Sequence, residues 1–170
     1  LPYLVYVGDR GSYKNFHLAV NAVSLVKGYG LIVVGGGRVN QSDQLLLEER
    51  LKGRYLHLDR LPNDKLNGLY NTAHALIYPS SYEGFGLPVI EAMAAGCPVI
   101  ATDASSIPEV AGEAGLLVDE VSAQAFASRI LTLEKSTLRE TLVKRGFENV
   151  KRFSWERCYQ ETVDFYHDMM

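Results

Sequence analysis

An α/β fold built on a doubly wound parallel sheet is predicted by two features of this sequence. Short apolar runs alternate with longer segments of helical periodicity over roughly the first two thirds of the chain, which is the order of repeated β-α units. The runs are apolar throughout, as expected for parallel strands that are buried on both faces. The predicted class is therefore a Rossmann-like sheet with helices on both sides.

Six strands and four helices are expected in the repeating part of the chain. The strands are placed at residues 3–7, 31–34, 55–58, 75–78, 99–101 and 115–118, and the helices at residues 16–27, 42–52, 64–72 and 88–95. From Ala123 onwards the pattern is almost entirely helical, with Ser154 suited to the N-cap of a final helix over residues 154–170. We expect residues 1–170 to form a single domain.

Composition excludes several classes of protein. The chain has 170 residues, 47% of them hydrophobic, and no apolar run approaches the 18–20 or so residues of a membrane-spanning helix. The net charge is −3, and no long basic run indicates nucleic-acid binding. Because the chain starts at Leu1 and enters a strand at once, we expect it to be part of a longer protein.

Cysteine and histidine spacing gives no indication of a metal site. Cys97 and Cys158 lie far apart and belong to no C-x-x-C pair, and the four histidines are scattered. We expect both thiols to be free in a reducing compartment. No metal ligand is therefore predicted.

The segment between Glu83 and Glu91 is the strongest functional signal. Pro88 suits the start of a helix, and Gly84 and Gly86 just before it allow backbone N–H groups to approach an anion or a sugar hydroxyl. Taken singly, each glutamate would be an ordinary loop acid or helix-dipole residue. Their combination with the glycines and Pro88, between a strand and a helix, indicates a ligand site.

Two other predicted strands end in glycine-rich loops. The first strand is followed by Gly8, Arg10, Gly11 and Lys14. Two glycines and two cations thus precede a helix, which fits a diphosphate clamp or, alternatively, a solvated turn. Residues 35–37 are three glycines after the second strand, but position 40 is Asn where a dinucleotide motif needs a third spaced glycine. We therefore expect Gly36 to lie beside a nucleotide or, alternatively, in a tight strand-to-helix turn, and NAD binding is disfavoured.

The motifs PSSYEGFGLP (79–88), EAMAAGCPV (91–99) and IPEV (107–110) resemble the donor-binding half of retaining GT-B glycosyltransferases of the GT4 group. The resemblance extends from Tyr6 to about Tyr166. It implies a Rossmann-like C-terminal domain that binds a nucleotide sugar without a metal ion or other cofactor. The acceptor would bind an N-terminal domain outside this chain.

The resemblance also implies a role for each candidate residue. Lys14 and Arg10 would neutralise the donor diphosphate, although Asp9 stands where many members have an arginine. Glu91 would bind the ribose, and Glu83 with backbone groups of residues 84–87 would hold the sugar. The catalytic set is Glu83, Lys14 and Arg10, and the substrate-binding set is Gly8, Lys14, Gly36, Arg60, Leu61, Glu83, Gly84, Phe85, Gly86, Leu87 and Glu91.

The function expected from this resemblance is transfer of a hexose, with mannose from GDP-mannose favoured, to a glycan or lipid-linked acceptor in polysaccharide assembly. A UDP-sugar transferase domain and a non-catalytic nucleotide-binding module are the alternatives. We expect a cytoplasmic location, at the inner face of the membrane if the missing domain contacts lipid. The chain alone is expected to bind donor without transferring it.

Overall fold

The computed structural model describes residues 1–169 and contains one parallel sheet of six strands. The strand order is β3-β2-β1-β4-β5-β6, the doubly wound arrangement. The strands are β1 (Tyr3–Val7), β2 (Gly30–Val34), β3 (Tyr55–Leu58), β4 (Ala75–Tyr78), β5 (Val99–Thr102) and β6 (Gly115–Val118). The predicted fold class is confirmed.

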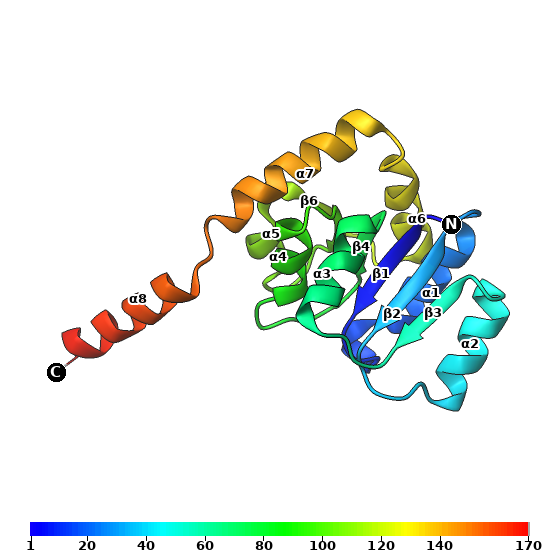
Figure 1. Cartoon of the computed structure of the whole chain (residues 1–170), viewed down its shortest axis with the longest axis horizontal. Helices are drawn as coiled ribbons and strands as arrows, with labels where there is room; N and C mark the ends of the chain where they lie inside the picture. Colours follow the sequence, from blue (N-terminus) through cyan, green and yellow to red (C-terminus); the bar gives the residue numbers. More distant parts are fainter. Residues whose placement is uncertain (170) are drawn as a thin grey trace.

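Helices cover both faces of the sheet (Figure 1). On one face α1 (Phe16–Leu25) packs between α2 (Gln41–Leu51) and α6 (Ala123–Thr132). On the other face α4 (Leu87–Ala94) packs against α3 (Asn63–Thr72) and α5 (Ile107–Ala111). Helix α7 (Ser136–Val150) runs from α6 to α4, and the single turns η1 (Ser12–Lys14) and η2 (Gly112–Ala114) complete the body.

The alternation of side chains along each strand produces two hydrophobic cores. Leu4 and Tyr6 of β1 point into the core under α1, whereas Val5 between them points into the core under α4. All three are buried. The sheet is thus buried on both faces, as the apolar runs predicted.

Several element boundaries differ from the sequence predictions by one or two residues, and one α-helix was not predicted. Helix α1 ends at Leu25 because Val26 is extended, β5 includes Thr102, and α4 begins at Leu87 rather than Pro88. Helix α5 is not among the four helices expected in the repeating part of the chain. Its five residues are too few for helical periodicity to show in the sequence.

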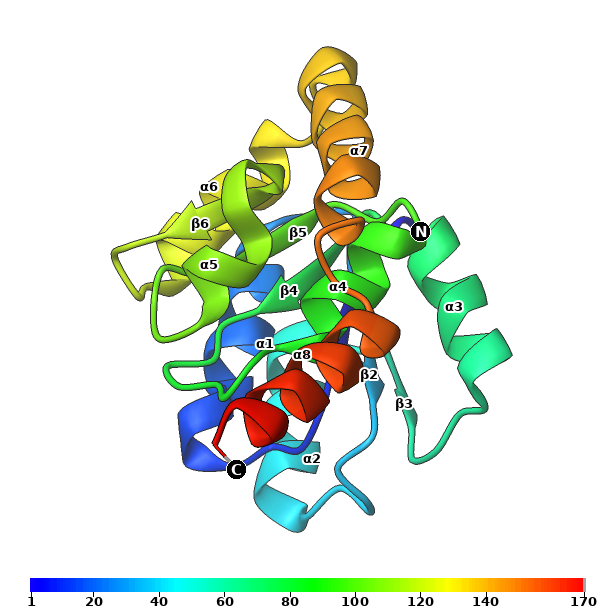
Figure 2. The same ribbon diagram turned by 90° about the vertical axis from the view of Figure 1, so that its left-hand side faces the viewer.

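The last helix, α8 (Trp155–Asp168), begins at the predicted cap, where the Ser154 hydroxyl accepts a hydrogen bond from the Arg157 N–H. It projects from the body (Figure 1), so that the view of Figure 2 shows it in front of the other elements, and it has no buried residue. Residue 170, the end of the predicted helix, lies outside the described residues. Among residues 1–169, no helix combines the length and apolar character needed to cross a membrane.

Candidate functional site

The carboxyl ends of β1 and β4 are adjacent at the point where the chain reverses its direction across the sheet. The loops that follow these strands are joined by hydrogen bonds. The Asn15 side-chain amide donates to the Pro79 carbonyl at 2.8 Å, and the Ser81 N–H donates to the Tyr13 carbonyl, also at 2.8 Å. Such a switch point is where ligands bind in open α/β sheets, and here its two loops have a fixed relative position.

Lys14 and Glu83, predicted separately from these two loops, form an ion pair across the switch point. Lys14 Nζ lies 2.6 Å from Glu83 Oε1, and the side chains are only 13% and 11% exposed. The ammonium group also lies 5.4 Å from the ring centroids of Tyr13 and Tyr78, within range of cation–π attraction. The structure thus concentrates one cation, one carboxylate and two aromatic rings in one place.

Tyr78 is a site residue that the sequence analysis did not identify. It is the last residue of β4, and Lys14 Nζ lies 3.5 Å from its hydroxyl. Burial, followed by hydrogen bonding to Glu83, raises the pKa of Tyr78 above its usual range. The phenol therefore stays neutral and remains a hydrogen-bond donor. No sequence signal distinguished Tyr78 from the buried apolar residues of its strand.

The backbone between Glu83 and Phe85 is held by two serines from the loop after β5. Ser105 Oγ donates to the Glu83 carbonyl at 2.8 Å. Ser106 Oγ approaches the Glu83 and Phe85 carbonyls at 2.9 and 3.0 Å. These contacts fix the loop that precedes α4. Neither Ser105 nor Ser106 was among the residues predicted for the site.

Helix α4 presents its N-terminus and Glu91 beside this loop. Its N-cap, Gly86, has a φ of 98°, a left-handed conformation that favours glycine. Glu91 is exposed, and its Oε2 accepts a hydrogen bond from the Tyr70 hydroxyl at 3.3 Å. Burial, followed by the charge of Glu91, raises the pKa of Tyr70. Tyr70, on α3, is a second neighbour of the site that sequence patterns did not indicate.

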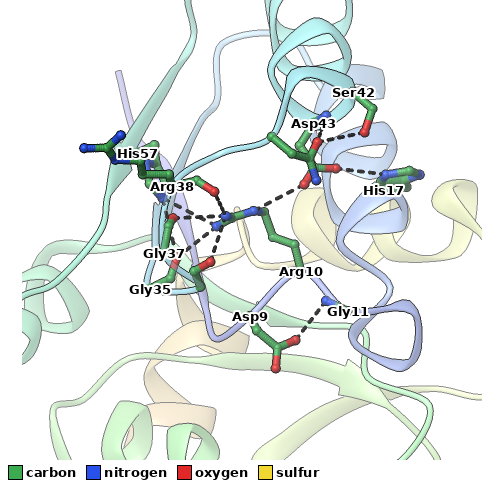
Figure 3. A network of polar contacts seen from close by, with 12 residues as sticks. Asp9, Arg10, Gly11, His17, Gly35, Gly37, Arg38, Ser42, Asp43 and His57 are labelled. Atoms are coloured by element: carbon green, nitrogen blue, oxygen red, sulfur yellow. Dashed lines mark hydrogen bonds and ion pairs between the residues drawn. The ribbon is translucent and has the colours of Figure 1, made fainter.

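Arg10 lies near the site, but its guanidinium is directed into the glycine-rich loop after β2 (Figure 3). Its Nη1 and Nη2 donate to carbonyl oxygens of residues 35–38 at 2.8–3.0 Å. Its Nε lies 3.3 Å from Asp43 Oδ2 on α2. The two cations of the first loop therefore have different surroundings: Lys14 faces Glu83, and Arg10 is enclosed by the neighbouring loop.

The two predicted glycines of the nucleotide subsite adjoin these cations. A Cβ built on Gly8 would lie 3.9 Å from Lys14 Nζ, so the lysine passes over this residue. A Cβ on Gly36 would lie 3.1 Å from the Gly8 carbonyl oxygen. Gly8 and Gly36 therefore form one continuous wall next to Lys14.

The remaining predicted residues lie farther along the same edge of the sheet. Arg60 and Leu61 follow β3, the edge strand two positions from β1. Arg60 is exposed, and Leu61 packs partly buried against the core under α4. On the other side of the site, Phe85 and Leu87 are exposed and line a groove of about 790 Å³ with residues of α8.

No group of three or more histidine, cysteine, aspartate or glutamate residues within residues 1–169 has an arrangement that could hold a metal ion. The electrostatic character of the site comes instead from Lys14, Glu83, Glu91 and the N-terminus of α4. A helix N-terminus carries partial positive charge and unpaired N–H groups. The arrangement is therefore suited to an anionic ligand that also carries hydroxyl groups.

The sheet order and the polar loops at its switch point define a Rossmann-like α/β domain of the kind found in GT-B glycosyltransferases. The family described as "Glycosyl transferases group 1" matches residues 1–149. The chain therefore belongs to the group 1 glycosyltransferases, as its motifs indicated.

Relatives in this family include two bacterial O-antigen enzymes. The chain is 36% identical over 172 residues to O-antigen chain mannosyltransferase B of Escherichia coli, a match that covers 96% of this chain and 45% of the relative. It is 32% identical over 159 residues to O-antigen chain mannosyltransferase RfbU of Salmonella typhimurium, covering 88% of this chain and 45% of the relative. The chain thus spans about half the length of these proteins.

Solved structures share the fold over nearly the whole chain. Sucrose-phosphate synthase from Thermosynechococcus elongatus superposes with a TM-score of 0.88 and 32% identity, over 99% of this chain and 45% of that one. Anabaena HepE, solved in complex with UDP-glucose, superposes with a TM-score of 0.85 over 98% of this chain and 48% of that one. At 20% identity, the HepE likeness is one of fold.

Proposed function

We propose that this chain is the donor-binding domain of a retaining glycosyltransferase that transfers a hexose, with GDP-mannose as the favoured donor. The observation that carries the proposal is the Lys14–Glu83 pair at the β1/β4 switch point, 2.6 Å apart and beside the N-terminus of α4. Similarity to two mannosyltransferases supports mannose as the transferred sugar.

Each group in the site has a distinct task in this proposal. Lys14 binds the donor diphosphate and stabilises the negative charge that develops on it as the sugar leaves. Glu91 accepts hydrogen bonds from the ribose hydroxyls. Glu83 and backbone groups of residues 84–87 bind the sugar, with Ser105 and Ser106 holding that backbone in place.

We expect the chain to bind donor but to transfer little sugar by itself. The relatives are about twice its length, and we infer that their remaining half contributes the acceptor site. The glycan or lipid-linked acceptor would bind there, and any membrane contact would belong to that half. Donor binding is therefore the property to measure on this chain.

A thermal-shift panel with GDP, UDP, ADP, NAD, GDP-mannose and UDP-glucose, each with and without EDTA, tests the proposal. A ligand at 100 times its Kd adds about 2.7 kcal/mol to the free energy of unfolding, which raises Tm by roughly 5–10 °C in a domain of this size. We expect GDP and GDP-mannose to raise Tm regardless of EDTA. A shift by UDP and UDP-glucose instead would reassign the donor.

Two outcomes would contradict the proposed class of function. A shift produced by NAD alone would replace the glycosyltransferase assignment with a dinucleotide-binding one. Binding of a nucleoside diphosphate with no further rise in Tm from any attached sugar would favour a non-catalytic nucleotide-binding module.

The control variant for these Tm measurements is Arg50→Met, because Arg50 is exposed on α2 and lies outside the site.

A further inference from the structure

Arg10 is enclosed by a ring of backbone carbonyl groups. Nη1 donates to the Gly35 carbonyl at 2.9 Å, and Nη2 lies 2.9, 3.0 and 2.8 Å from the carbonyl oxygens of Gly36, Gly37 and Arg38 (Figure 3). The side chain is only 6% exposed. These contacts direct the guanidinium into the loop rather than towards Lys14.

The loop has the backbone conformation that this enclosure requires. Gly35, Gly36 and Gly37 have φ angles of 88°, 76° and 69°, three successive left-handed residues, which only glycine adopts readily. A Cβ on Gly36 would lie 2.7 Å from Arg10 Nη1. The three glycines therefore let the backbone close around the planar guanidinium.

Asp43 anchors the other side of Arg10. Its side chain is 5% exposed, and its Oδ2 lies 3.3 Å from Arg10 Nε. Its N–H is capped by Asn40 Oδ1 at 2.8 Å, and its Oδ1 contacts His17 Nε2 at 3.2 Å. Arg10 is thus neutralised by a buried carboxylate that is itself fixed to the first turn of α2, which leaves little of its charge for a ligand.

We propose that Arg10, together with Asp43, is a positioning residue that fixes the glycine-rich loop as one wall of the donor site. The loop adjoins Gly8, over which Lys14 passes, so its position sets the space available next to the lysine. Arg10 thus acts on the donor through the loop, in place of the direct diphosphate contact predicted from the sequence. The inference depends on the proposed function, because the wall matters only if a nucleotide binds beside it.

Arg10→Lys is the most informative variant, since lysine keeps the charge but lacks the planar fork that reaches several acceptors at once. If Arg10 positions the loop, the variant should lower the affinities for GDP and for GMP by a similar factor of about tenfold or more, the size of one lost charge-assisted bond. Asp43→Asn should reproduce this pattern. Isothermal titration with GDP, GMP, UDP and UMP supplies the measurements.

The matched controls are Arg50→Met and Glu49→Gln, which remove exposed charges from the same helix as Asp43. Both should leave all affinities unchanged. Retention of GDP and GMP affinity in Arg10→Lys would overturn the proposal, as would a loss confined to GDP, which would indicate a direct diphosphate contact.

Loop order supplies a readout that does not depend on nucleotide binding. We expect the backbone ¹⁵N order parameters of Gly36 and Gly37 to fall from about 0.85 to below about 0.6 in Arg10→Lys, while those of β4 stay unchanged. An unchanged loop would overturn the anchoring role. If the unsubstituted chain bound none of the four nucleotides, the proposed function would fail, and the order parameters would still decide whether Arg10 holds the loop.

Discussion

Arg10 and Lys14 are two cations of one short loop, but the fold gives them different tasks. Arg10 Nη1 and Nη2 contact loop carbonyls, and its Nε is next to the buried Asp43. Lys14 has one carboxylate partner, Glu83, and two aromatic neighbours at the switch point. Arg10 therefore stabilises the loop beside the site, whereas Lys14 can bind an anionic ligand in exchange for its contact with Glu83.

The difference shows that the role of a cation depends on which acceptors compete for its N–H groups. A guanidinium with five donors in a rigid fork suits a ring of carbonyls, whereas an ammonium on a flexible stem can exchange one partner for another. The lysine can turn from Glu83 towards a diphosphate at the cost of a single ion pair. Movement of Arg10 would break several contacts together and release the glycine loop.

Asp43→Ala should have the largest effect on stability. The substitution leaves the Arg10 charge buried without its carboxylate, which typically costs roughly 3–5 kcal/mol. We expect the free energy of unfolding in urea to fall by this amount and Tm to fall by about 10 °C. Glu49→Ala, an exposed change on the same helix, should have almost no effect.

A small effect of Asp43→Ala on stability, similar to that of Glu49→Ala, would contradict the structural role assigned to Arg10 and Asp43. It would mean that the carbonyl ring alone satisfies Arg10. The Asp43 carboxylate would then be free to take part in ligand binding, and the division between the two cations would not hold.

Lys14→Met should produce the largest loss of ligand affinity. A charge-assisted hydrogen bond contributes about 1.5–3 kcal/mol, so the Kd for GDP should rise roughly 10- to 100-fold. The Kd for guanosine should change little, because the nucleoside lacks the diphosphate. Titration calorimetry with both ligands measures the two values, and an equal loss for guanosine would show that Lys14 acts on the whole site.

Substitution of Glu83 and of Glu91 distinguishes the contribution of sugar binding to donor affinity from that of ribose binding. Glu83→Gln removes the competitor of the diphosphate for Lys14, so affinity for GDP should be maintained, while the additional affinity of GDP-mannose over GDP should fall by about tenfold. Glu91→Gln should weaken GDP and GDP-mannose by a similar factor. Equal loss of GDP binding in both variants would contradict the assigned roles.

Much of the fold and the central pair of the site could be predicted from the sequence. Apolar runs located all six strands, and the rule that ligands bind at the carboxyl ends of strands selected the loops that carry Lys14 and Glu83. The direction of the Arg10 side chain could not be predicted, because it depends on three left-handed glycines and on Asp43 from another helix. Such contacts arise only when separate segments pack together.

Two other features could not be predicted for related reasons. Tyr78 and Tyr70 are buried aromatic residues whose hydroxyls happen to reach Lys14 and Glu91, and nothing in their local sequence separates them from ordinary core residues. Ser105 lies in a loop with a left-handed conformation that no glycine or asparagine marks. Each role depends on a partner more than 20 residues away in the chain.

Substitution of His74 should have the smallest effect, a change in the pH dependence of stability with no change in ligand binding. His74 lies before β4, at the end of that strand opposite to both cations. Its ring is tilted against that of Tyr29, with the centroids 4.7 Å apart, and it is close to Arg139 and Glu134. Burial lowers the pKa of His74 below its usual 6.5. Because the unfolded chain then binds a proton more readily than the folded one, the stability that neutral His74 contributes is fully present above pH 6.5 and is lost as the pH falls below it.

Urea unfolding of His74→Gln should show a smaller loss of stability between about pH 7 and pH 5.5 than the unsubstituted chain. The Kd for GDP should show the same pH dependence in both proteins, and a difference would mean that this end of the sheet is coupled to the site of Lys14.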